Sequence, residues 1–183
     1  MSQRNDTAIW SGLFRISAES GQTLQAQIRQ AIVAAILDRQ IAASMPLPSC
    51  RILAEKLGSQ NMTALSLREF IRNAFDSDPA IGAAFREDLR AVLSRDPACR
   101  GYSAPLLYFK GFHALQAYRV AHFYWTHQHP TLARYLQSRI SEVFAVDIHP
   151  GAQIGKGIMF DHATSIVIGE TAVVEDDFSM LHE

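Results

Sequence analysis

The apolar residues near the C-terminus recur every six positions. With one offset of two residues, the series runs through Ile148, Ile154, Phe160, Ile166, Ile168, Val174 and Met180. No α-helix has this period, because an α-helix turns once in about 3.6 residues. One inward aliphatic residue in six, with small or polar residues between, is typical of repeats that wind a triangular left-handed β-helix. Ordinary short strands and turns stay open as the alternative.

Three hexads make one coil of such a β-helix, so residues 148–183 should contain two coils of eighteen residues each. The pattern stops inside a hexad, at Met180–Glu183. A solenoid needs about three or more repeat units and a protected end, because each coil buries its apolar face against its neighbours. We therefore expect a chain that is truncated at its C-terminus.

The preceding part of the chain has the apolar spacing of α-helices. Asp78-Pro79 is typical of a helix start, and Asp96-Pro97 of a helix end. Ser103 is expected to cap a long helix that continues through Phe123. The six predicted helices cover about 22–42, 50–58, 64–75, 79–93, 103–123 and 130–143.

The sequence thus predicts an α+β fold, with an α-helical N-terminal domain followed by the first coils of a left-handed parallel β-helix. We expect a poorly ordered segment over 1–20, the helical domain over 21–145 and the β-helix over 146–183.

Composition excludes several classes of function. The chain has 17 Lys and Arg against 18 Asp and Glu, and 48% of its residues are hydrophobic, which disfavours disorder and a cationic nucleic-acid module. We expect no membrane helix and no signal peptide. Two cysteines, Cys50 and Cys99, make neither a disulfide framework nor a four-thiolate zinc site, so a cytoplasmic location is predicted.

Polar residues gather around one expected corner of the first coil, namely Asp147, His149, Asp161 and His162. An imidazole oriented by a carboxylate removes a proton from a hydroxyl at neutral pH. Asp147 and His162 are fifteen residues apart, slightly less than one expected coil, so neighbouring coils can bring them together. The alternative is a corner that is simply polar and solvated.

Other histidines and carboxylates have simpler interpretations. A zinc site made of His149, Asp161, His162 and His182 fits poorly, because the local ligand spacing of zinc sites is missing. We therefore expect no metal. The histidines on or just after the long helix are expected to be hydrogen-bonding or surface groups, namely His113, His122, His127 and His129. Asp96 either ends its helix or directs a carboxylate toward the coil corner.

Two stretches carry a resemblance to a known family. RDPACRGYSAPLLYFKGFHALQAYR (95–119) and VDIHPGAQIGKGIMFDHATSIVIGETAVVEDD (146–177), together with the helical region before them, resemble bacterial serine O-acetyltransferases, which are hexapeptide-repeat acyltransferases. The resemblance implies transfer of acetyl from acetyl-CoA to the L-serine hydroxyl, giving O-acetylserine for cysteine biosynthesis. It also identifies residues 21–145 with the helical domain of that family.

The resemblance implies a role for four residues. His162 in DHAT matches the general base, and Asp147 in VDIHPG matches the carboxylate that orients it. Asp161 in DHAT and Asp96 in RDPA match the carboxylates that bind serine. Acetyl-CoA is implied as a co-substrate, with no permanently bound cofactor, and most of its groove is expected beyond residue 183.

The resemblance also implies a homotrimer or hexamer, with active sites between neighbouring β-helices. From the composition we expect no nucleic-acid or membrane partner. The resemblance implies binding to cysteine synthase through a C-terminal tail, and we expect this sequence to lack that tail. Three residues depart from the family pattern: Ser165 replaces Gly, Phe178 replaces a small aliphatic residue, and Glu183 replaces a small residue. We expect weak or absent activity in this shortened chain, and a non-catalytic helical oligomerisation module is the alternative function.

Overall fold

The computed structural model describes residues 48–181. The segment 1–20, the predicted helix over 22–42, and the residues His182 and Glu183 lie outside the described part of the chain. None of the helices in the described part has the length and apolarity needed to cross a membrane.

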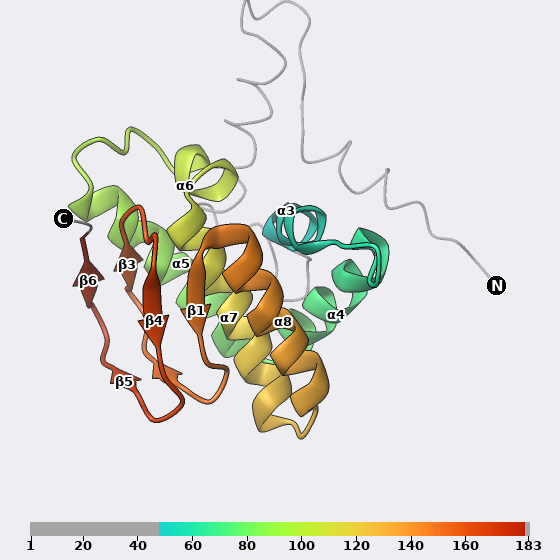
Figure 1. Cartoon of the computed structure of the whole chain (residues 1–183). Coiled ribbons are helices and arrows are strands. Elements are labelled where there is room, and N and C mark those ends of the chain that lie inside the picture. Colours follow the sequence, from blue (N-terminus) through green and yellow to red (C-terminus); the bar gives the residue numbers. More distant parts are fainter. Residues whose placement is uncertain (1–47, 182–183) are drawn as a thin grey trace, which may run out of the picture. The chain divides into compact units, whose positions relative to one another are not determined.

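Six α-helices occupy the first part of the described chain (Figure 1). The Asp78 carboxylate caps the third of these helices by accepting a hydrogen bond from the Ala80 amide at 2.9 Å, and Asp96 is its C-cap. The predicted start and end of this helix are therefore confirmed. The helices are α3 (Pro48–Leu57), α4 (Ala64–Ser77), α5 (Pro79–Arg95), α6 (Ser103–Leu107), α7 (Lys110–Thr126) and α8 (Pro130–Phe144).

The predicted long helix from Ser103 is wrong, because the structure divides it into α6 and α7. Tyr102 is the N-cap of α6 and makes no side-chain capping bond, so Ser103 is not the cap. Between the two helices Phe109 is extended, and the His113 imidazole on α7 bonds the Leu106 carbonyl at the end of α6 at 2.8 Å. The break lets α7 take its own direction through the core.

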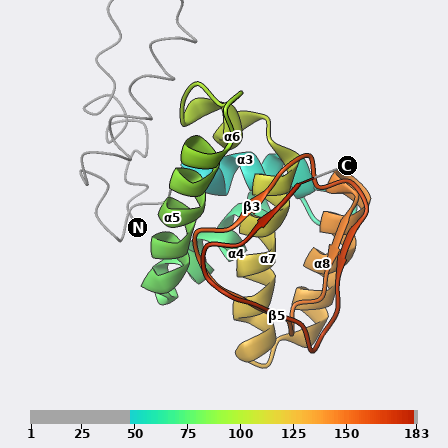
Figure 2. The same cartoon turned by 90° about the vertical axis from the view of Figure 1, so that its left-hand side faces the viewer.

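Helix α7 lies between α5 and α8 (Figure 2). All its residues from Gly111 to Ala121 are buried, as are Phe123 and Tyr124. A helix buried on all sides has no solvent face, so its polar side chains must find partners inside the protein.

Six short strands follow Ala145, and they pair in parallel as β1 with β4, β2 with β5 and β3 with β6. This arrangement is the start of a parallel β-helix (Figure 1). The strands are β1 (Val146–Ile148), β2 (Gln153–Ile154), β3 (Met159–Phe160), β4 (Ile166–Ile168), β5 (Val173–Val174) and β6 (Ser179–Met180).

The first coil is longer than predicted. The register pairs Ile148 with Ile168 and Phe160 with Met180, so one coil takes 20 residues instead of eighteen. The extra two residues lie between Phe160 and Ile168, where the sequence shows its offset. They enlarge one corner of the coil, over residues 161–165.

Candidate active site

The enlarged corner carries two of the four predicted site residues, Asp161 and His162. Its ends are fixed by backbone hydrogen bonds, from the Asp161 amide to the Met180 carbonyl at 2.9 Å and from the Ser165 amide to the Ala145 carbonyl at 2.8 Å. The His162 side chain is 76% exposed, and its Nε2 lies 3.8 Å from Asp161 Oδ1. The corner therefore presents an accessible imidazole beside a carboxylate.

The backbone of this corner is unusual for residues that carry a side chain. His162, Ala163 and Ser165 have φ values of 52°, 60° and 67°, in the left-handed region that favours glycine. Such a conformation persists only where the surrounding structure holds it in place.

Residues at the start of α7 pack against the enlarged corner. The Lys110 ammonium group donates a hydrogen bond to the Thr164 hydroxyl. A Cβ on Gly111 would lie 2.2 Å from the Phe160 carbonyl oxygen and 2.9 Å from Ala163 Cβ. Because no side chain fits there, glycine lets the helix approach the backbone of the corner.

Asp147 lies on β1, between the fully buried Val146 and Ile148, so its half-buried side chain faces outward. The amide of Gln137 on α8 donates a hydrogen bond to Asp147 Oδ1 at 2.8 Å. The enlarged corner leads into β4, where Ile166 pairs with Val146. Asp147 and His162 thus belong to the same end of the coil, and a catalytic contact between them stays a prediction.

Asp96 ends α5, as one of its two interpretations predicts. Its amide donates to the Val92 carbonyl at 3.0 Å, and its carboxylate accepts a hydrogen bond from the Ala98 amide at 2.8 Å. The adjacent Arg95 donates to the Gly157 carbonyl of the first coil at 2.9 Å and to Asp177 of the second coil. Arg95 therefore fixes the Asp96 loop to both coils, while serine binding by Asp96 stays a prediction.

A buried ionic network was missed by the sequence analysis. Asp88 on α5 is fully buried and accepts hydrogen bonds from Arg119 Nε, Arg119 Nη2, Gln116 Nε2 and the Ile158 amide, all between 2.9 and 3.0 Å. Burial raises the pKa of the Asp88 carboxyl, whereas the Arg119 charge and these hydrogen bonds lower it. Every partner is a donor, so the site accommodates the ionised carboxylate.

Helix α7 also bonds the backbone of the first coil. Arg119 donates to the carbonyl of Gly155 at 2.7 Å, and His122 Nδ1 lies 2.8 Å from the Pro150 carbonyl oxygen. Burial raises the pKa of Tyr118 to about 12, so its phenol stays protonated and donates to the Ala152 carbonyl at 2.5 Å.

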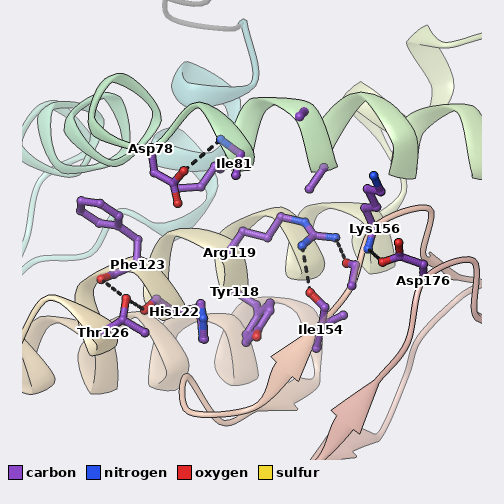
Figure 3. Close-up of a pocket in the computed structure, with 14 residues that line it drawn as sticks. Asp78, Ile81, Tyr118, Arg119, His122, Phe123, Thr126, Ile154, Lys156 and Asp176 are labelled. Carbon is purple, nitrogen blue, oxygen red and sulfur yellow. Dashed lines mark hydrogen bonds between the residues drawn. The ribbon is translucent and has the colours of Figure 1, made fainter.

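A cavity of about 430 Å³ lies where α5, α7 and the first coil meet, and Figure 3 shows Arg119 reaching across it toward Ile154. Asp96, Asp147, Asp161 and His162 are not among its lining residues. The buried network around Asp88 and Arg119 joins α5 and α7 to the first coil. None of its members belongs to the enlarged corner at residues 161–165.

The remaining histidines on and after α7 behave as predicted. His113 bonds the Leu106 carbonyl, His122 the Pro150 carbonyl and His127 the Phe123 carbonyl, while His129 is exposed. Burial lowers the pKa of His113 to about 4. Within residues 48–181, no group of three or more His, Cys, Asp or Glu side chains is placed to bind a metal ion.

Comparison with known proteins identifies the family. The family described as Serine acetyltransferase, N-terminal, matches residues 9–117, which are more than half of the chain. The chain belongs to the serine acetyltransferase family. The predicted family resemblance is therefore confirmed.

The serine acetyltransferase of Haemophilus influenzae is 55% identical over 130 residues, which are 71% of this chain and 49% of the relative. A solved serine acetyltransferase in complex with CoA is 46% identical with a TM-score of 0.75, covering 84% of this chain and 70% of that one. The soybean serine acetyltransferase complexed with serine is 44% identical with a TM-score of 0.75, covering 86% and 69%.

The chain spans about half the length of the curated relatives that it matches. The similarity to solved serine acetyltransferases confirms the predicted α+β fold, with helices followed by the start of a β-helix. Ser165 has a φ of 67°, which glycine adopts without strain, so the glycine expected at this position from the family resemblance would suit the backbone there.

Proposed function

We propose that this protein is a serine O-acetyltransferase, which transfers acetyl from acetyl-CoA to the hydroxyl of L-serine and gives O-acetylserine for cysteine biosynthesis. The observation that carries this proposal is the exposed imidazole of His162 beside Asp161, at the enlarged corner of the coil, in a chain of this family. An accessible imidazole is the group that enzymes use to activate a hydroxyl near neutral pH.

His162 accepts the proton of the serine hydroxyl while the serine oxygen attacks the thioester carbonyl of acetyl-CoA. The tetrahedral intermediate collapses by breaking the carbon–sulfur bond, and the CoA thiolate leaves and takes up the proton from His162. Asp147 orients the imidazole, and Asp161 and Asp96 bind the serine substrate. No acyl-enzyme is required, so neither Cys50 nor Cys99 takes part.

The co-substrates are supported by the relatives. One solved serine acetyltransferase contains CoA and another contains serine, and each is at least 44% identical to this chain. The carboxylates of Asp161 and Asp96 suit the ammonium group of an amino acid, because opposite charges attract strongly at a partly buried site.

We further propose a cytoplasmic homo-oligomer, a trimer or hexamer as in the family resemblance. On the second coil, the outward-facing Val167 and Val173 are 75% and 66% exposed. Aliphatic side chains on adjoining outer faces suit a contact with another copy of the chain. Binding to cysteine synthase stays an expectation for the family and is not proposed for this chain.

The test measures the release of thiol from acetyl-CoA by the 183-residue chain, with and without L-serine. Serine-dependent release that disappears in His162→Ala and persists in His127→Ala would support the proposal, because His127 is an exposed histidine outside the corner. If no variant releases thiol while circular dichroism shows that all are folded, the proposed activity is wrong for this shortened chain, in line with the weak or absent activity expected from its sequence, and a helical oligomerisation module becomes the better description.

A further inference from the structure

Asp147 receives its hydrogen bond from a helix outside the β-helix. Gln137 Nε2, on α8, donates to Asp147 Oδ1 at 2.8 Å. Because Val146 and Ile148 are buried on either side, β1 directs the Asp147 carboxylate outward toward this helix. The candidate orienting carboxylate is therefore itself oriented by a side chain from another element.

The direction in which Gln137 points its amide is fixed by a second neighbour. Arg134 Nη1 donates to Gln137 Oε1 at 3.4 Å, and the guanidinium carbon of Arg134 lies 5.2 Å from the centre of the Trp125 ring. A guanidinium only donates and a carboxylate only accepts, so one amide orientation satisfies both neighbours. The Nε2 group faces Asp147 because the oxygen faces Arg134.

The surroundings of this contact are open and polar. Gln137 and Asp147 line a groove of about 430 Å³ between α8 and β1, whose other lining residues are Arg134, Ser138, Ser141 and Glu142. A carboxylate in such a groove is solvated and free to rotate unless a donor holds it. The helix-borne amide supplies that donor.

We propose that Gln137 is a positioning residue, which holds Asp147 in the orientation that aligns the imidazole of His162. This inference rests on the proposed function, in which Asp147 orients the general base. An amide suits the task because it binds one carboxylate oxygen and leaves the charge of Asp147 in place to stabilise the imidazolium. A lysine or arginine at this place would neutralise that charge.

The test measures the tautomer of the His162 imidazole directly. We would label the chain with ¹⁵N-histidine and measure the His162 tautomer at pH 8, with the signal identified by its loss in His162→Ala. Gln137→Leu keeps the size of the side chain and removes the donor, and Ser141→Ala is the matched control from the same groove. Asp147→Asn provides the reference for an imidazole without its carboxylate.

We expect one dominant tautomer in the unmodified chain and in Ser141→Ala. Gln137→Leu should show a mixture of tautomers that approaches the mixture in Asp147→Asn. The proposal is overturned if Gln137→Leu keeps the ratio of the unmodified chain, or if the unmodified chain already has the mixture of Asp147→Asn.

Thiol release separates this inference from the proposed function. Where serine-dependent turnover occurs, Gln137→Leu should lower kcat about tenfold while the KM for serine stays unchanged, because the amide acts on proton transfer and not on substrate binding. Absence of turnover in every variant contradicts the proposed function, whereas the tautomer ratio still decides whether Gln137 acts on His162.

Discussion

Arg119 on α7 donates two hydrogen bonds to the carboxylate of Asp88 on α5, from Nε at 2.9 Å and from Nη2 at 3.0 Å. Both side chains are buried. The same guanidinium donates to the Gly155 carbonyl, and Asp88 accepts from the Ile158 amide. One ion pair thus joins two helices to the backbone of the first coil.

Replacement of Arg119 by Met should lower the free energy of unfolding by about 3–5 kcal/mol, because it leaves the Asp88 carboxylate buried without its cation. Urea unfolding followed by circular dichroism measures the loss. Arg90→Met is the control, since Arg90 pairs with Glu87 at an exposed site and should change stability by about 1 kcal/mol or less. Equal, small losses in both variants would show that the buried pair does not stabilise the fold.

The sequence indicated the helix ends better than the partners of buried charges. Asp78 and Asp96 act within a few residues of their own helix, so their roles follow from local sequence. Asp88 occupies an apolar position, seven residues after Ile81 and three after Phe85, which is the signal that a buried carboxylate was present. Its partner could not be named, because Arg119 belongs to another helix.

At the candidate site, too, the sequence indicated local features but not the contacts between elements that are distant in the chain. The two-residue offset between Ile166 and Ile168 was visible in the sequence, but the pairing register was needed to show that the extra residues enlarge the corner carrying His162. The contact between Gln137 and Asp147 depends on how α8 lies against β1, and nothing in the spacing of the two residues indicates it.

Gly111→Ala should destabilise the protein by about 1–3 kcal/mol, because the added methyl group would meet the Phe160 carbonyl at 2.2 Å and force α7 away from the enlarged corner. Gly82→Ala is the matched control within a helix. At Gly82 the nearest atom is the flexible end of Arg86 at 3.6 Å, so alanine should stabilise α5 by about 1 kcal/mol. Thermal unfolding of both variants tests the opposite signs, and stabilisation by Gly111→Ala would contradict the close approach.

Ser165→Gly should raise the free energy of unfolding by about 1 kcal/mol, because the φ of 67° at Ser165 is strained for a residue with a Cβ and relaxed for glycine. Ser138→Gly, within α8, should lower it by about 1 kcal/mol, because glycine is unfavourable inside a helix. Urea midpoints of the two variants should therefore move in opposite directions. A loss of stability in both would show that the corner is not strained at Ser165.

His113 should make the stability of the protein depend on pH. Its side chain is 2% exposed, and burial lowers its pKa from 6.5 to about 4. Between these two values the unfolded chain binds a proton that the folded chain does not, so the free energy of unfolding falls as the pH is lowered from 6.5 to 4. The neutral His113 contributes about 3 kcal/mol to the free energy of unfolding. This contribution is fully present above pH 6.5 and is lost as the pH falls toward 4.

Urea unfolding at pH 7, 5.5 and 4 measures this dependence, with His113→Gln as the reference. Glutamine retains a donor for the Leu106 carbonyl, which His113 bonds at 2.8 Å, and it does not titrate. The raised pKa of Asp88 acts in the opposite direction and is common to both proteins, so their difference isolates the histidine. Equal slopes would mean that His113 becomes protonated without opening the core, and a steeper fall in the unmodified chain would confirm that the imidazole must stay neutral between α6 and α7.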